Sequence, residues 1–168
     1  MTDDEVISAV VRYVALMTNV RAIRTHAGKD PPEQPYVAVN FLGSNVVRQH
    51  EQTIEYVDTG VDNTAGKETV TATPVLEMEW RFSVHAYGPE PTGILRRLIS
   101  ASRLSQPSEP LYPELVIHSH SSLRSIPEMI NSVWEPRAQI DLFVRGIIRD
   151  EFTVDVIDKA TFEHQKMA

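Results

Sequence analysis

The stretch from Val75 to Tyr87 constrains the fold most, because apolar and polar side chains alternate along it. A period of two is typical of a β-strand with one buried face. The apolar row consists of Leu76, Met78, Trp80, Phe82, Val84 and Ala86. The polar row consists of Glu77, Glu79, Arg81, Ser83, His85 and Tyr87. At about 3.3 Å per residue the strand would span roughly 43 Å, well beyond the usual ~5–6 residues. We therefore expect part of it to pair with another chain or to project from the body.

Two amphipathic helices are predicted to cover the apolar row. Thr2 and Glu5 have the spacing of a capping box, which predicts a helix over residues 3–18. Its apolar stripe consists of Val6, Ile7, Val10, Val11, Val14 and Met17. A second helix is predicted over residues 92–104, and its stripe consists of Ile94, Leu95, Leu98, Ile99 and Ser102.

The rest of the chain alternates between strands and turns. Further strands are predicted from Tyr36 to Leu42, Val46 to Val57, Leu115 to His118, Ala138 to Arg145 and Phe152 to Ile157. Gly43-Ser44-Asn45 is expected to separate the first two of them. Residues 58–73 are rich in glycine, asparagine and threonine, and we expect an exposed loop or arm there. This order predicts an α+β fold with a mostly antiparallel sheet and two helices packed on one face, in a single domain over residues 1–168.

The composition disfavours several classes of protein. With 16 basic and 23 acidic residues the formal net charge is −7, which argues against tight sequence-independent DNA binding. The absence of cysteine excludes disulfides and thiolate nucleophiles. No segment approaches the ~20 apolar residues of a membrane span. The acidic residues after Met1 do not fit a secretory signal, so we expect neither export nor a membrane partner.

No constellation of residues clearly predicts catalysis. The sequence contains neither a G-x-S-x-G elbow nor a glycine-rich phosphate-binding motif. His118 and His120 are expected on one strand face, and His85 could join them as a metal ligand. A small metal-dependent hydrolase that uses His118 and His120 is therefore one alternative. The simpler interpretation, two polar side chains near a strand end, predicts no enzyme, no metal and no cofactor.

Three segments spread over nearly the whole chain carry a family resemblance. They are Gln34-Pro35-Tyr36-Val37-Ala38-Val39, Phe82-Ser83-Val84-His85-Ala86-Tyr87-Gly88 and Val133-Trp134-Glu135-Pro136-Arg137-Ala138-Gln139-Ile140-Asp141-Leu142. In this order and spacing they resemble the phage neck and tail terminator proteins, which sit where a long phage tail meets the connector.

The resemblance implies a structural virion protein that forms a ring, typically of six subunits. Such a ring would cap the tail tube, contact a head-completion or connector protein on its other side, and count the tail sheath among its further partners. It would leave a channel through which DNA passes without specific binding. It would be assembled in the host cytoplasm and reside in the virion. A tail-tube or head-completion protein of the same virion is a second alternative.

The candidate subunit or partner contacts are Glu77, Glu79, Arg81, Trp134, Arg137, Asp141, Asp58, Asp62 and Lys67. Trp134 is expected to pack in the core or between strands. Arg137 and Asp141 could instead form a surface ion pair with each other. Residues 46–73 contain two basic and five acidic side chains. This acidic balance fits a channel lining that DNA can slip past.

Overall fold

The computed structural model describes residues 1–25, 32–49, 53–62, 68–111, 113–130 and 132–156. Contacts divide the chain into two compact units. The helix-bearing unit comprises Met1–Gln49 and Glu77–Ile148, and the three-stranded unit comprises His50–Leu76 and Arg149–Ala168. Strand β4 (Glu68–Tyr87) runs through both units. The predicted α+β class is confirmed, while the single domain over residues 1–168 stays a prediction.

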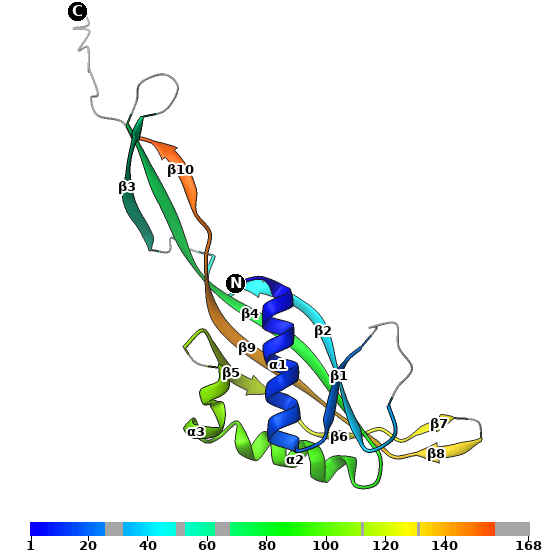
Figure 1. Ribbon diagram of the computed structural model, residues 1–168. Coiled ribbons are helices and arrows are strands. Elements are labelled where there is room, and N and C mark those ends of the chain that lie inside the picture. The colour runs from blue at the N-terminus through cyan, green and yellow to red at the C-terminus, as the bar shows by residue number, and fades with distance from the viewer. Residues whose placement is uncertain (26–31, 50–52, 63–67, 112, 131, 157–168) are drawn as a thin grey trace, which may run out of the picture. The chain divides into compact units, whose positions relative to one another are not determined.

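In the helix-bearing unit, five strands lie side by side in one sheet, and β4 is the central strand (Figure 1). In the order of neighbours, the strands are β1 (Arg21–Arg24), β2 (Tyr36–Val46), β4, β9 (Arg137–Arg149) and β5 (Leu115–His120). The short strand β6 (Arg124–Ser125) pairs antiparallel with β9. β2 is antiparallel to β4, and β5 is antiparallel to β9. Only β1 and β2 form a parallel pair in the registers described for this unit.

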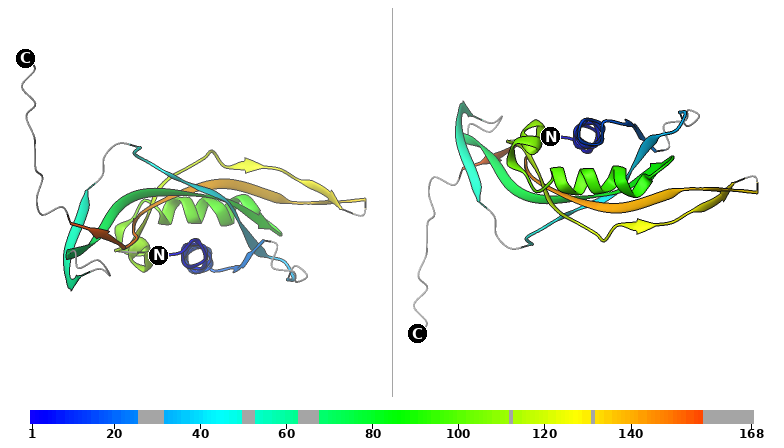
Figure 2. Two further views of the ribbon diagram at one scale, coloured as in Figure 1. Left: turned by 90° about the horizontal axis from the view of Figure 1, so that it is seen from above. Right: turned by 90° about the horizontal axis from the view of Figure 1, so that it is seen from below.

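Two helices lie on the same side of these strands (Figure 2), as the sequence predicted. They are α1 (Asp3–Thr18) and α2 (Pro91–Ala101). α1 begins with the predicted capping box, in which the Thr2 amide donates to Glu5 Oε2 at 2.6 Å and the Glu5 amide donates to Thr2 Oγ1 at 3.3 Å. α2 ends at Ala101 and not at residue 104 as predicted, and it is followed by α3 (Ser105–Ser108) and a 3₁₀ turn, η1 (Glu109–Leu111).

The core lies between the helices and the apolar row of β4. Trp80, Phe82, Val84 and Ala86 are fully buried, as predicted, whereas Leu76 and Met78 of the same row are only half-buried. The four buried side chains pack with α1, α2, β2 and β9 in one cluster that includes Val6, Val10, Val14, Leu95, Leu98, Val37, Val39, Ile140, Leu142 and Val144. The indole Nε1 of Trp80 donates to Asp3 Oδ1 at 2.7 Å, so its only polar atom is satisfied at the start of α1.

The three-stranded unit contains β3 (Ile54–Asp62), the first part of β4 and β10 (Phe152–Asp155). β3 and β10 both pair antiparallel with β4, which is therefore the central strand. The loop predicted over residues 58–73 is wrong for 58–62 and 68–73, which are strand, while 63–67 lie outside the described residues. The β-branched threonines of this segment favour a strand. Its apolar and polar residues do not alternate clearly, because little of the segment packs on a core.

The predicted break at Gly43-Ser44-Asn45 is also wrong, because β2 continues to Val46 through a register shift between Phe41 and Gly43. Pairing with β4 overrides the local turn propensity, and Gly43 takes a φ of 142° at the shift. The strand predicted from Val46 to Val57 is wrong at its start, since β3 begins at Ile54. β1 was not predicted, because four residues flanked by arginines give no clear period.

No helix in the described residues is long and apolar enough to cross a membrane.

Truncation of a buried leucine and of a nearby exposed leucine should have different effects on the stability of the protein. Leu98→Ala removes a fully buried side chain from α2 and should lower the free energy of unfolding by about 2–5 kcal/mol. The matched change Leu104→Ala removes an exposed side chain and should cost less than about 0.5 kcal/mol. Urea unfolding followed by circular dichroism measures both. Equal losses would contradict the placement of the core.

Candidate functional site

The face of the sheet opposite the helices is polar, because side chains alternate along β4 and Trp80 and Phe82 point into the core. At one end of this face, three charges from β4 and β9 form a compact ion-pair group. Arg145 Nε lies 2.9 Å from Glu79 Oε2, and Arg145 Nη1 lies 3.8 Å from Glu77 Oε1. Arg48 Nε also lies 3.3 Å from Glu77 Oε2. Glu77 and Glu79 are therefore held by arginines of their own chain.

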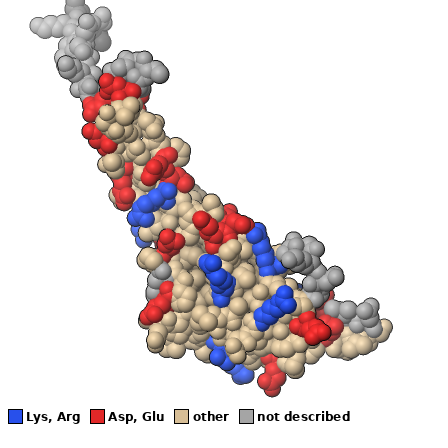
Figure 3. All heavy atoms as spheres, viewed as in Figure 1, with Lys and Arg blue, Asp and Glu red and all other residues tan. Residues whose placement is uncertain are grey.

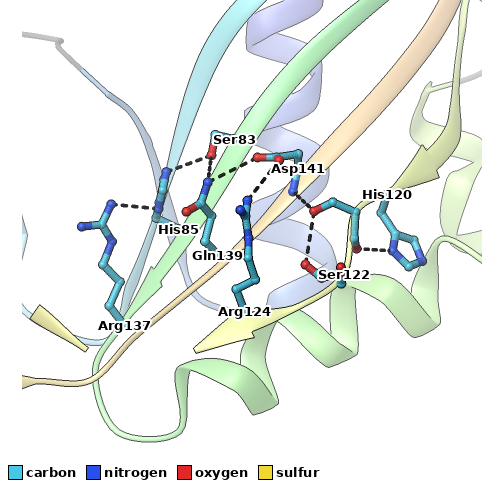
Figure 4. A network of polar contacts seen from close by, with 9 residues as sticks. Ser83, His85, His120, Ser122, Arg124, Arg137, Gln139 and Asp141 are labelled. Carbon is cyan, nitrogen blue, oxygen red and sulfur yellow. Dashed lines mark hydrogen bonds and ion pairs between the residues drawn. The ribbon is translucent and has the colours of Figure 1, made fainter. Parts of the chain in front are cut away.

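The middle of the polar face carries a continuous hydrogen-bond network (Figure 4). Ser83 Oγ accepts from Gln139 Nε2 at 2.7 Å and lies 3.0 Å from His85 Nε2. The same Gln139 nitrogen donates to Asp141 Oδ1 at 3.3 Å. Arg124 Nη2 pairs with Asp141 Oδ2 at 3.2 Å, so the network links β4, β9 and β6.

At the other end of the network, Arg137 occupies a half-buried position between three partners. Its Nη1 pairs with Glu128 Oε2 at 2.6 Å, and its Nη2 lies 3.0 Å from His85 Nδ1. Its guanidinium also stands 5.3 Å from the centre of the Tyr87 ring, and Tyr87 stacks on Tyr36. The predicted alternative of a direct Arg137–Asp141 ion pair is wrong: each of the two pairs with a different residue.

The surroundings of His85 hold its imidazole neutral. Burial, followed by the positive charge of Arg137, lowers the pKa of His85 to about 4. A neutral ring can accept from Arg137 at Nδ1 and donate to Ser83 Oγ from Nε2, so every contact in Figure 4 around His85 has a donor and an acceptor. Protonation would remove the acceptor that faces Arg137.

Trp134 lies in surroundings that differ from those predicted. The sequence predicted a packed tryptophan, but 63% of its surface is exposed. It lies on a separate two-stranded sheet formed by β7 (Glu128–Ile130) and β8 (Val133–Glu135), where it pairs with Met129. This hairpin extends beyond the end of α2 (Figure 1, Figure 2), and its residues are not part of the core cluster formed by the described residues. Met129 and Val133, which sequence reasoning missed, are also more than half exposed.

The remaining candidates fall into different surroundings. Arg81 is exposed and stands 5.1 Å from the ring centre of Phe143. Asp58 and Asp62 lie on β3 in the three-stranded unit, and Lys67 lies outside the described residues. The structure thus places Arg81, Arg137, Asp141, Glu77 and Glu79 on one polar face, with Trp134 on the adjoining hairpin.

The three-stranded unit carries an apolar face that sequence reasoning did not find. Directly opposite residues of paired strands share a face, and the registers Ile54–Pro74, Tyr56–Ala72–Phe152 and Val70–Val154 define it. Tyr56 is 63% exposed and Phe152 57% exposed, so nothing in the described chain covers this face. The pairs Asp58–Val70 and Asp62–Glu68 place three carboxylates at one end of it. Only the register, and not local periodicity, reveals this arrangement.

His85 does not join the other two histidines. His120 faces the core side of the sheet because it pairs with the buried Leu142, whereas His85 lies on the polar face. A register shift between Ile117 and Ser119 places His118 at a bulge, and His118 and His120 still line one pocket beside Ser102 and Arg103. Within the described ranges, no group of three or more His, Cys, Asp or Glu side chains could hold a metal ion.

Acidification should weaken the protein through His85. Its pKa is about 4 in the folded chain and close to 6.5 in the unfolded chain, so the unfolded state binds the proton first as pH falls. Stability should therefore decline between about pH 6.5 and pH 4. His85→Gln should remove this part of the decline, whereas His118→Gln, at an exposed position on β5, should keep it. Urea unfolding at about pH 7 and pH 5 measures the difference, and identical pH dependence in all three proteins would contradict it.

Comparisons with known proteins identify the family. A search among curated proteins found no match. A family model described as phage neck terminator protein matches residues 4–166, which is nearly the whole chain and covers both units. This agrees with the resemblance carried by the three sequence segments. The chain belongs to the phage neck terminator protein family.

Proposed function

We propose that this protein forms a ring at the phage neck that caps the tail tube and joins it to the head connector. The family match over residues 4–166 is the observation that carries this proposal, since it supports a structural role in the neck. The ring is a homo-oligomer, with six copies as the expected number. A tube subunit lies on one side, a head-completion protein on the other, and the tail sheath is a further partner. DNA passes through the ring without specific binding.

The β7–β8 hairpin supports a docking role. Met129, Val133 and Trp134 expose apolar surface on a separate two-stranded sheet. Aromatic side chains of this kind are enriched at the centre of protein interfaces. We assign this hairpin to the contact with the tube or the connector. The ion pair between Arg137 and Glu128 ties the start of β9 to β7 and so fixes the base of the hairpin.

The polar face is assigned to the channel or to a subunit contact. Glu77, Glu79 and Asp141 are balanced there by arginines of the same chain. An internally paired surface offers DNA phosphates few free cations, which fits passage without retention. Arg81 is the exposed cation of β4 on this face.

The two alternative functions, a metal-dependent hydrolase and another virion protein, are addressed by different observations. A metal-dependent hydrolase based on His118, His120 and His85 loses its geometric support, because the sheet separates His85 from His120. The prediction that the protein is not an enzyme stays a prediction that the family match favours. A tail-tube or head-completion role is distinguished by assembly: tube subunits polymerise without limit, whereas a terminator stops at closed rings.

Tube capping in vitro tests the proposal. Purified tube protein should form tubes of unlimited length, and addition of this protein should stop growth and place one ring at a tube end, as seen by negative-stain electron microscopy. Trp134→Ser should weaken capping roughly thirty-fold if the indole is an interface hot spot. Val116→Ser, at another exposed apolar position, is the matched control and should cap normally. Uncapped tubes with the unaltered protein would refute the role.

A further inference from the structure

The apolar face of the three-stranded unit needs a covering partner. A sheet of this size is stable when one face packs on a hydrophobic surface. Here Ile54, Tyr56, Phe152 and Val154 remain exposed on one face, and the described part of the unit contains no helix. Covering such side chains releases about 25 cal/mol for each Å² of apolar surface removed from water. The face thus has the chemistry of a docking surface with an acidic end.

The helix-bearing unit has a pocket of the complementary kind. It lies beside the C-terminal ends of α1 and α2, next to α3, and has a volume of about 540 Å³. Its lining is mostly apolar and includes Leu16, Met17, Leu104 and Pro107, together with the charged side chain of Arg97. Leu16 and Leu104 are each more than half exposed, so the lining is accessible.

The apolar face and the pocket lie in units of different net charge. The three-stranded unit contains ten of the chain's 23 acidic residues and four of its 16 basic ones, so it carries nearly all of the net charge of −7. Arg97 lines the pocket, and Arg96 and Arg103 directly adjoin the lining residues Arg97 and Leu104 in the chain. The side chains of these three arginines are exposed and form no ion pair within the described part of the chain. Figure 3 shows acidic side chains gathered around β3, whereas basic and acidic side chains occur together on the visible face of the helix-bearing unit.

We propose that the apolar face of the three-stranded unit of one copy docks on the arginine-rimmed pocket of a second copy. Tyr56 and its neighbours would enter the pocket, while Asp62 and Glu68 would approach Arg97 and Arg103. Pairing of two apolar faces with each other would bring like charges together, which disfavours a symmetric dimer. Contact between two different surfaces passes from copy to copy and can close into a ring. The inference rests on the homo-oligomer of the proposed function and assigns its subunit contact.

A charge exchange tests the electrostatic part. Arg97→Glu with Arg103→Glu should weaken self-association at least tenfold, and so should Asp62→Arg with Glu68→Arg, because each pair of changes places like charges across the contact. All four changes in one chain should restore association to near the unaltered value. Sedimentation velocity over a range of concentrations measures this. Failure of the fourfold variant to recover, with its circular dichroism unchanged, would overturn the pairing.

Crosslinking tests the contact without disturbing charge. Because the chain has no cysteine, Tyr56→Cys and Leu104→Cys each introduce a single thiol at an exposed position. A short bismaleimide should join the two proteins when they are mixed, and should give no product with either alone. Val116→Cys replaces Leu104→Cys as the matched control and should give no product. Crosslinking of Tyr56→Cys to itself, or no product in the mixture, would overturn the inference.

The two proposals fail in different ways. A crosslink between Tyr56→Cys and Leu104→Cys in a protein that does not cap tubes would keep the contact and refute the neck function. Normal capping without that crosslink would keep the function and refute the contact. A crosslink from Tyr56→Cys to the tube subunit instead would assign the apolar face to a different partner and also overturn the inference.

Discussion

Burial of the Trp80–Ala86 row of β4 under α1 and α2 is the interaction on which the helix-bearing unit depends. Because successive side chains of a strand point to opposite faces, fixing this row in the core also fixes Ser83 and His85 on the outer face. There they meet Arg137, Gln139 and Asp141 of β9 in one hydrogen-bond network. The polar face is therefore a consequence of the core, and its charges are largely satisfied within the chain.

Apolar side chains are exposed at two places outside the core. The β7–β8 hairpin exposes Trp134, and the three-stranded unit exposes Tyr56 and Phe152. A chain that acted alone would gain stability by covering such side chains, so their exposure fits a subunit that is completed by neighbours in an assembly. In the proposed contact between copies, the acidic three-stranded unit of one copy would face the arginines beside the pocket of the next, which would favour this pairing over a symmetric one.

Much of the fold could be predicted from periodicity. The elements that could not be predicted depend on which strands become neighbours. α1, α2 and the apolar row of β4 carry strong local patterns that agree with their burial. β3 and the exposed Trp134 were misjudged because local propensity does not show which strand becomes the neighbour. The apolar face appears only when the partners of Tyr56 across β4 are known. The pairing of Arg137 with His85 likewise joins residues far apart in sequence.

In the proposed ring, one copy of this chain is structurally complete only when a neighbour covers its three-stranded unit. Amide hydrogen exchange of β3 and β10, compared between a dilute single copy and the assembled ring, measures this most directly. We expect rapid exchange in the single copy and exchange slowed by orders of magnitude in the proposed ring, with the core amides of β9 protected in both. Equal protection of β3, β10 and β9 in the single copy would contradict it.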